Sequence, residues 1–180
     1  MNVEKIKAVV RDIPDFPKPG IIYKDITPIL QDGAIFSALI GYLAEPYRAN
    51  MPKYVAGIES RGFIFGAALA AELGCGFIPV RKAGKLPYKT IRQSYSLEYG
   101  EATIEMHEDA AAAGDKIVLI DDLLATGGTA QAAVSLLYER YRAAVLDKVR
   151  ARYYAMPRYL PVGHCVFCER YADGRSCPTR

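Results

Sequence analysis

Residues 117–130, which read IVLIDDLLATGGTA, decide the fold of this chain. Four apolar residues at 117–120 lie between polar residues, with Asp121 and Asp122 directly after them. A short apolar run that is rich in β-branched side chains and bounded by polar residues is typical of a buried strand. Two glycines flanked by threonines, at 126–129, and then an alanine-rich segment follow. The stretch therefore predicts a strand, a tight turn of small residues and the beginning of a helix.

The turn at 126–129 has the residue types that suit a phosphate group. Glycine allows backbone angles closed to other residues and lets a ligand approach the amides closely. The first turn of a helix adds unpaired N–H donors and a partial positive charge. The hydroxyls of Thr126 and Thr129 can donate further hydrogen bonds. Asp121 and Asp122 would repel a phosphate, but they suit ribose hydroxyls, a Mg²⁺ ion or a developing positive charge.

Two better-known phosphate loops do not match this stretch. No Lys follows Gly128, so the G-x-x-x-x-G-K-[ST] pattern is missing, and no G-x-G-x-x-G is present. A buried strand, an acidic turn and a helix cap without any ligand remains the plainer alternative at this point.

Three further stretches join this one in a resemblance to a known family. They are VVRDIPDFPKPGIIYKDITPIL at 9–30, GIESRGFIFGAALAAELG at 57–74, and the segment from FIPVRKAGKLPYKT at 77–90 to YSLEYG at 95–100. With DDLLATGGT, they resemble the type I phosphoribosyltransferases, in particular the adenine phosphoribosyltransferase branch. The similarity extends to about Leu137 and loosely to Val149. It implies Mg²⁺-dependent transfer of a phosphoribosyl group from phosphoribosyl pyrophosphate (PRPP) to adenine, by a cytoplasmic homodimer, in purine salvage.

Strands and helices are expected to alternate from residue 54 to residue 137, which predicts an α/β fold with a doubly wound, mainly parallel sheet flanked by helices. We expect strands at 54–58, 77–80, 117–120 and 144–149, and helices at 3–12, 33–48 and 63–73. Residues 1–149 would form the phosphoribosyltransferase domain, with a hood at 1–32, a core at 33–149 and a lid, a mobile hairpin, at about 82–106. Residues 150–180 are an atypical basic tail rich in Cys, Tyr and Arg.

The resemblance assigns the base to the N-terminal segment and the lid. It implies that Tyr23 stacks on the purine while the backbone of Ile22 and Lys24 reads its edge; the commoner residue at position 23 is Phe. An aromatic face beside backbone amides suits a flat, uncharged base. Glu98 would assist proton transfer from the base, with Tyr99 a further substrate contact. Without the resemblance, an exposed loop glutamate is the more frequent explanation of Glu98.

The resemblance also assigns the phosphates and the sugar. Arg61, Arg81, Lys82 and Lys85 would receive the pyrophosphate, although such a cationic run is often only a solvated edge. Ala125, Thr126, Gly127, Gly128 and Thr129 would bind the 5′-phosphate. Asp121 and Asp122 would hold the ribose diol, and with Arg61 and Glu98 they form the expected catalytic set. Mg²⁺ would be held mainly through PRPP and pyrophosphate oxygens, with no certain direct protein ligand.

Composition narrows the other possibilities. Residues 1–137 carry 14 Lys and Arg against 16 Asp and Glu, so no basic surface for nucleic acid is expected there. No apolar stretch reaches membrane-spanning length, and no secretory signal is expected. His107 is expected at the surface. Cys165, Cys168 and Cys177 form an incomplete pattern, so free thiols are favoured over zinc. A phosphoribosyltransferase for another purine and a non-catalytic PRPP-binding regulatory protein remain as alternative functions.

Overall fold

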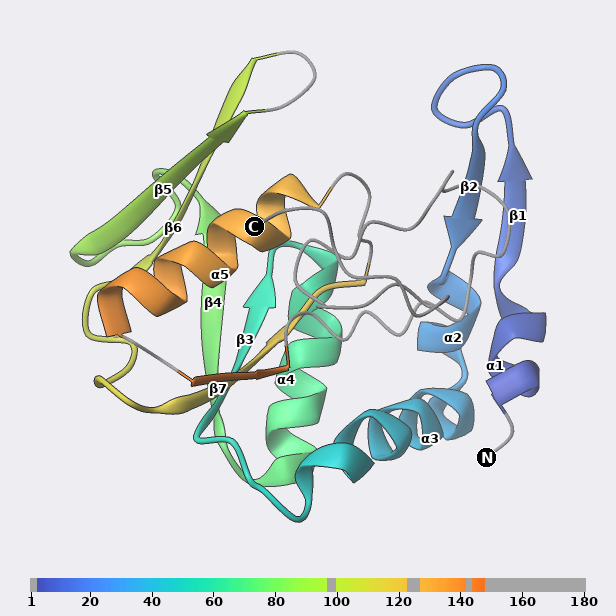
Figure 1. Cartoon of the computed structure of the whole chain (residues 1–180). Helices are drawn as coiled ribbons and strands as arrows, with labels where there is room; N and C mark the ends of the chain where they lie inside the picture. The colour runs from blue at the N-terminus through green and yellow to red at the C-terminus, as the bar shows by residue number, and fades with distance from the viewer. Residues whose placement is uncertain (1–2, 97–99, 123–126, 142–143, 148–180) are drawn as a thin grey trace, which may run out of the picture.

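The computed structural model describes residues 3–96, 100–122, 127–141 and 144–147 (Figure 1). In chain order its elements are α1 Val3–Val9, β1 Arg11–Pro14, β2 Ile22–Asp25, α2 Thr27–Gln31, α3 Gly33–Ala44, the 3₁₀ helix η1 Glu45–Tyr47, β3 Tyr54–Ile58, α4 Arg61–Leu73, β4 Gly76–Lys82, β5 Thr90–Ser96, β6 Glu101–His107, β7 Lys116–Ile120, α5 Gly128–Tyr141 and β8 Ala144–Asp147. No helix in these ranges is long and apolar enough to cross a bilayer.

A six-stranded sheet in the order β5-β6-β4-β3-β7-β8 forms the centre of the molecule. Strand β3 runs parallel to both β4 and β7, and β8 runs parallel to β7. Strands β6 and β5 are added to the β4 edge in antiparallel orientation. The predicted α/β fold with a mainly parallel sheet is therefore confirmed, and the parallel strands β3 and β7 end side by side.

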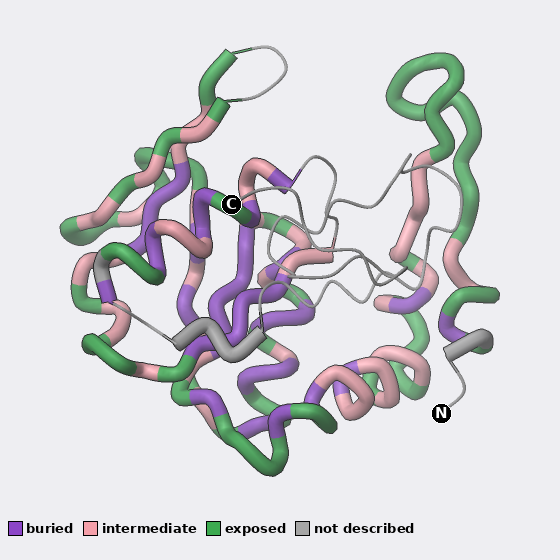
Figure 2. The backbone as a smooth tube through the Cα atoms, in the orientation of Figure 1, coloured by how far each residue is buried: buried purple, intermediate pink, exposed green. Residues whose placement is uncertain are grey.

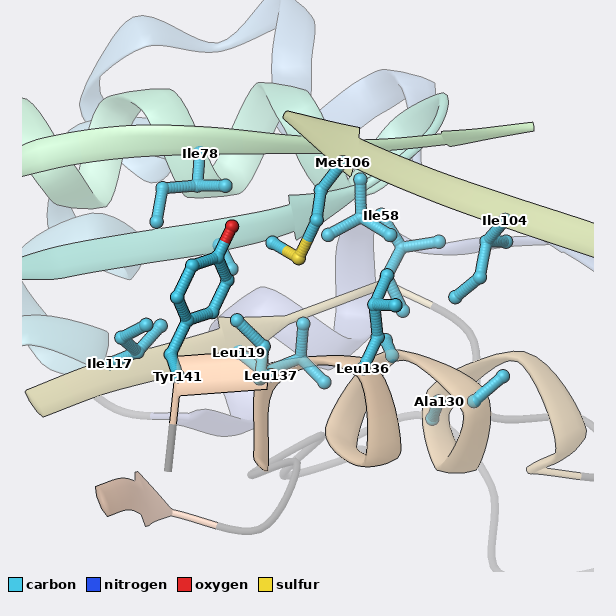
Figure 3. Packing of buried hydrophobic residues seen from close by; sticks show 14 residues of the cluster. Ile58, Ile78, Ile104, Met106, Ile117, Leu119, Ala130, Leu136, Leu137 and Tyr141 are labelled. Carbon is cyan, nitrogen blue, oxygen red and sulfur yellow. The ribbon is translucent and has the colours of Figure 1, made fainter. Parts of the chain in front are cut away.

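The two faces of the sheet are covered by different helices, which makes the fold doubly wound. Strand β7 shows the division, because Ile117 and Leu119 pack on the α5 side while Val118 and Ile120 pack on the side of α3 and α4. Figure 3 shows side chains of α5, including Leu137 and Tyr141, meeting Met106 and the isoleucines of the strands. Because both faces of β7 are buried, its sequence is a continuous apolar run rather than an alternating one.

The predicted elements of the core lie where the sequence placed them, with shifted ends. Strand β3 spans residues 54–58 as predicted, β4 is longer than the predicted 77–80, and α4 begins at Arg61 rather than at 63. The helix predicted at 33–48 ends at Ala44 and continues as the 3₁₀ helix η1. Pro46 lies in η1 and has no N–H to continue the α-helical hydrogen bonds.

The hairpin expected to form a lid extends the sheet. Strands β5 and β6 pair from Thr90–His107 to Ser96–Glu101, and β6 pairs with β4 at Arg81–Glu105. Burial falls from the base of the hairpin toward its end (Figure 2). Residues 97–99 lie outside the described residues, so closure of a lid stays a prediction.

The segment expected to form a hood stands apart from the main sheet. Strands β1 and β2 make their own antiparallel sheet, which Figure 1 shows on the opposite side of the view from the β5–β6 hairpin. The apolar side chains of Phe16, Ile21 and Ile22 are exposed on it. That this segment covers a substrate stays a prediction.

His107 is not the surface residue that the sequence suggested. It ends β6, is half-buried, and its ring meets Tyr88 edge-on with 6.0 Å between centroids. Its Nε2 atom is buried without a hydrogen-bond partner in the described part of the chain. Residues 88 and 107 are distant in sequence, so pairing of β5 with β6, rather than local polarity, sets this burial.

Glu105 is a fully buried carboxylate at the base of the hairpin, with a relative exposure of 0%. It accepts hydrogen bonds from the backbone N–H groups of Lys85 and Leu86, the hydroxyl of Thr90 and the guanidinium of Arg92. Burial alone would raise the pKa of Glu105, but these donors outweigh it and lower the pKa to about 2. Glu105 thus joins β6 to the 84–86 turn and to β5.

We expect Glu105→Gln to lower the free energy of unfolding by about 2 kcal/mol at pH 7, because an ionised acceptor of several buried hydrogen bonds is lost. The pKa of Glu105 falls on folding from 4.5 to about 2, so its ionised form stabilises the fold above pH 4.5. The difference between the two proteins should shrink as the pH falls toward 2. Denaturant unfolding across this pH range measures it, with Glu101→Gln, an exposed position of the same strand, as the control. Equal stability of Glu105→Gln and the parent at pH 7 would contradict the assignment.

Candidate active site

A polar cavity of about 430 Å³ opens at the carboxyl ends of β3 and β7. The described residues that line it are all polar or charged, namely Glu59, Ser60, Arg61, Lys82, Lys85, Asp121 and Asp122. Ligands of open α/β sheets bind at this edge, where parallel strands end and the following turns converge. The cavity therefore brings together five predicted substrate contacts from three separate stretches, namely Arg61, Lys82, Lys85, Asp121 and Asp122.

Helix α4 packs closely on the end of β7. Gly62, in the first turn of α4, faces the end of β7, where an added Cβ atom would lie 3.0 Å from the Ile120 carbonyl oxygen and 3.1 Å from Asp121 Oδ1. A larger residue at position 62 would push the helix away from Asp121. The GxxxG spacing of Gly62 and Gly66 is thus a packing feature that puts Arg61 beside the acidic pair.

Asp121 and Asp122 form a carboxylate pair that resists ionisation. Burial raises the pKa of Asp121 to about 7, and the neighbouring charge of Asp122 adds to this effect, although the Asp122 backbone N–H donates to Asp121 Oδ1 at 2.9 Å. Burial also raises the pKa of Asp122, against the attraction of Arg61. Two buried like charges side by side are stable only when a cation compensates them. The pair is thus suited to face positive charge.

Arg61 links three parts of the predicted site. Its Nε lies 3.0 Å from Asp122 Oδ2, and the side chain of Asp122 is only 8% exposed. Its Nη1 donates a hydrogen bond to the hydroxyl of Tyr23 on β2. The guanidinium carbon lies over the Tyr23 ring, 5.5 Å from the ring centre. Predicted as a pyrophosphate contact, Arg61 here neutralises Asp122 and connects it to Tyr23, the residue predicted to stack on the base.

Glu59 pairs with the cationic run that begins at the end of β4, at residues 81–85. Arg81 Nε and Lys85 Nζ each lie 2.8 Å from one oxygen of this carboxylate. Arg81 also donates to the Lys85 carbonyl oxygen and lies over the Phe63 ring, and it is not among the residues that line the cavity. Lys82 and Lys85 do line the cavity. Of the predicted pyrophosphate contacts, Arg61, Lys82 and Lys85 therefore line the cavity, whereas Arg81 does not and instead holds the Glu59 carboxylate.

The turn predicted to bind the 5′-phosphate is described only from Gly127 onward; Ala125 and Thr126 lie outside the described residues. Gly127 has a positive φ of 82°, and α5 begins at Gly128, within the predicted turn rather than after it. An added Cβ at Gly128 would come 3.3 Å from the Tyr95 ring, so β5 packs against the turn. The Thr129 hydroxyl, expected to face a phosphate, donates to the Tyr95 hydroxyl at 2.8 Å.

The predicted base-binding residues lie on β2. Tyr23 pairs with Ile13 of β1 and meets Phe16 edge-on, with 5.2 Å between ring centroids. The Lys24 side chain turns to Asp12, while Ile22 is exposed. Glu98 and Tyr99 lie outside the described residues, so their predicted roles stay predictions.

Sequence reasoning missed two residues of this site. Glu59 stood in the quoted ESRG stretch without a role, and Tyr95 stood in the predicted lid without one. Glu59 could have been found, because an acidic residue close to cations that are expected to bind pyrophosphate is itself expected to pair with one of them. For Tyr95 no signal was present, because its contact with Thr129 arises from the placement of β5 beside α5.

The described residues hold no group of three or more His, Cys, Asp or Glu side chains placed for a metal ion. The donors that Mg²⁺ prefers are oxygens, and the cavity offers Asp121 and Asp122 for this. Two carboxylates beside Arg61 fit a metal that takes most of its ligands from a bound phosphate ester and from water, as the sequence suggested. Cys165, Cys168 and Cys177 lie outside the described residues.

Comparison with known proteins finds chains of similar sequence and fold. The model of the phosphoribosyl transferase domain family matches residues 25–153. The adenine phosphoribosyltransferase of Acidothermus cellulolyticus is 52% identical over 142 residues, which cover 79% of this chain and 80% of the relative. The crystal structure of the Rhodothermus marinus enzyme of the same name has a TM-score of 0.72 at 51% identity and covers 78% of this chain and 80% of that one. The Saccharomyces cerevisiae enzyme, complexed with adenine and an imino-altritol bisphosphate, has a TM-score of 0.74 at 40% identity, covering 78% and 82%.

We expect Asp121→Asn to raise the free energy of unfolding of the unliganded protein by about 2 kcal/mol at pH 8, because a buried charge beside Asp122 is removed. Folding raises the pKa of Asp121 from 3.8 to about 7, so its ionised form destabilises the fold above pH 7. The gain should shrink below pH 7 and disappear near pH 4. Denaturant unfolding between pH 4 and pH 8, with the exposed Asp109→Asn as the control, measures this effect. A loss of stability at pH 8 would show that Asp121 has no such unfavourable charge.

Proposed function

This chain belongs to the phosphoribosyl transferase domain family, and we propose that it is an adenine phosphoribosyltransferase, which converts adenine and PRPP to AMP and pyrophosphate. The observation that carries the proposal is the strand-end cavity. There two carboxylates with raised pKa values, which directly follow β7, share the lining with Arg61, Lys82 and Lys85. Transfer of a ribosyl group needs negative charge near the sugar and positive charge near the departing pyrophosphate. The cavity supplies both at the ends of neighbouring strands.

The reaction breaks the bond between C1 of the ribose and a pyrophosphate oxygen, and it forms a bond between C1 and N9 of adenine. The electron pair of the broken bond leaves with pyrophosphate, so the sugar gains oxocarbenium character. Asp121 and Asp122 would stabilise that charge and accept hydrogen bonds from the ribose hydroxyls. Because burial raises both pKa values, ionised Asp121 and Asp122 are stabilised most when a positive centre lies beside them, which favours the oxocarbenium-like transition state over the ground state.

Binding of PRPP requires Arg61 to change partners. In the described structure its guanidinium is shared between Asp122 and Tyr23. We propose that the pyrophosphate takes over part of this guanidinium, which frees a carboxylate oxygen of Asp122 for the ribose. A bidentate group such as guanidinium suits this exchange, because it can keep one partner while it accepts another.

The family's Mg²⁺, when bound with PRPP, would neutralise pyrophosphate oxygens and weaken the bond to the leaving group. Lys82 and Lys85 would hold the pyrophosphate from the protein side. The 5′-phosphate would lie over the N–H groups at the beginning of α5, where Gly127 and Gly128 leave room for close approach.

Adenine would lie against the Tyr23 ring once Arg61, which lies over this ring, has turned to the pyrophosphate. The N9 proton must leave the base as the new bond forms, and Glu98 is the proposed acceptor. The backbone of Ile22 and Lys24 would read the base edge. The crystallised yeast relative bound adenine, which supports this choice of base. We expect a homodimer in the cytoplasm, with small molecules as substrates.

The direct test mixes the full chain with adenine, PRPP and Mg²⁺ and measures pyrophosphate release. We expect turnover in the parent and a loss of about 10²–10³-fold in kcat for Asp122→Asn, since a charge partner of the transition state is removed. Asp109→Asn, an exposed position, should retain full activity.

A panel of purines in the same assay checks the choice of base. Turnover with guanine or hypoxanthine but not with adenine would contradict the adenine assignment. Tight PRPP binding without turnover of any base would contradict the enzymatic one and point to a PRPP-binding regulatory protein.

A further inference from the structure

Glu59 is an acidic residue in a cavity that is expected to receive an anion. Its carboxylate is 8% exposed and lies at the carboxyl end of β3, where its backbone N–H donates to the Val80 carbonyl oxygen of β4. A carboxylate this close to a pyrophosphate would repel it. Attraction of the substrate therefore cannot explain why Glu59 lies in this cavity.

The contacts of Glu59 fall into a fixed and an exchangeable part. The fixed part is Arg81, whose Nε lies 2.8 Å from Oε2 and whose Nη1 donates to the Lys85 carbonyl oxygen, together with the backbone N–H of Lys82. The exchangeable part is Lys85, whose Nζ lies 2.8 Å from Oε1 and whose side chain is 48% exposed. A long, half-exposed lysine side chain can turn from one partner to another at small cost.

If Lys85 turned away, the Glu59 carboxylate would still have a charged partner. Burial works to raise the pKa of Glu59, but Lys85 and Arg81 outweigh it and lower the pKa below its usual value. When Lys85 turns away, Arg81 and the Lys82 N–H remain on the carboxylate, so the buried charge keeps its partners. A buried carboxylate that kept none would cost far more.

We propose that Glu59 is an internal competitor of pyrophosphate for Lys85, so that Lys85 is exchanged between the carboxylate and the bound product. This inference rests on the proposed function and names a residue that sets how tightly that site holds its product. Glu59 keeps Lys85 beside the cavity before substrate arrives. It takes Lys85 back when pyrophosphate leaves, which lowers the affinity for pyrophosphate and speeds its release.

The test is the affinity of the full chain for inorganic pyrophosphate with Mg²⁺, measured by titration calorimetry. Glu59→Gln keeps the size of the side chain and removes its charge, and we expect it to bind pyrophosphate about tenfold more tightly, the scale of one charge-assisted hydrogen bond. If Glu59 only held Arg81 and Lys85 in place for the substrate, Glu59→Gln would instead bind pyrophosphate more weakly than the parent. Unchanged or weaker binding by a folded Glu59→Gln protein overturns the proposal.

A double-mutant cycle separates local competition from a general effect of charge. Lys85→Gln should weaken pyrophosphate binding, and in that background Glu59→Gln should no longer tighten it. If Glu59→Gln tightens binding equally with and without Lys85, the carboxylate acts through the general field and the proposal fails. Glu72→Gln breaks an ion pair with Arg48 outside the cavity and should leave the affinity unchanged.

Two further controls keep the test decisive. Thermal unfolding checks that each variant is folded, and Glu59→Asp, which draws the carboxylate back from Lys85, replaces Glu59→Gln if the latter does not fold. It too should tighten binding. If the parent itself binds no pyrophosphate, the proposed function fails; if the parent binds and the Glu59 variants bind no more tightly, only the present inference fails.

Discussion

The ion pair between Arg61 and Asp122 joins the two strand ends on which the site depends. Arg61 begins α4 after β3, and Asp122 follows β7, the parallel neighbour of β3. The pair forms because α4 approaches the end of β7 closely at Gly62. It also compensates one of two buried carboxylates that would otherwise repel each other. The site thus depends on the packing of the fold at this point, because loss of the close approach of α4 to β7 would leave Asp122 without its cation.

Two carboxylates of the cavity, Asp122 and Glu59, are held in internal ion pairs. Asp122 is paired with Arg61, and Glu59 is paired with Lys85 and Arg81. An anionic substrate and a cationic transition state would each find partners by exchange with these internal ones. Such exchange keeps buried charges compensated at every stage, which limits the desolvation cost that an open cluster of like charges would carry.

The fold was predictable from the sequence where local pattern alone decides structure. The apolar run at 117–120 and the segment at 54–58 give β7 and β3, and the alanine-rich stretches give α4 and α5. Elements that depend on distant pairing were less predictable. The sheet position of β5 and β6, and the burial of Glu105 and His107, follow from long-range strand pairing that no local pattern contains.

The site residues were predictable as a set but not in their arrangement. Family motifs indicated Arg61, Lys82, Lys85, Asp121 and Asp122, and these side chains do line one cavity. The sequence did not show that Arg61 would be shared between Asp122 and Tyr23, that Arg81 would lie behind Glu59, or that Thr129 would face Tyr95. These are choices of partner among neighbouring polar groups, and they depend on side-chain placement across different elements.

The most direct measurement of the central claim is a crystal structure of the full chain with AMP bound, followed by one with PRPP and Mg²⁺. We predict that the 5′-phosphate lies over the N–H groups of residues 127–129 and that the ribose hydroxyls contact Asp121 and Asp122. We further predict that with PRPP the Arg61 guanidinium contacts the pyrophosphate. A nucleotide bound elsewhere, with the Arg61–Asp122 pair unchanged and the strand-end cavity empty, would contradict the central claim.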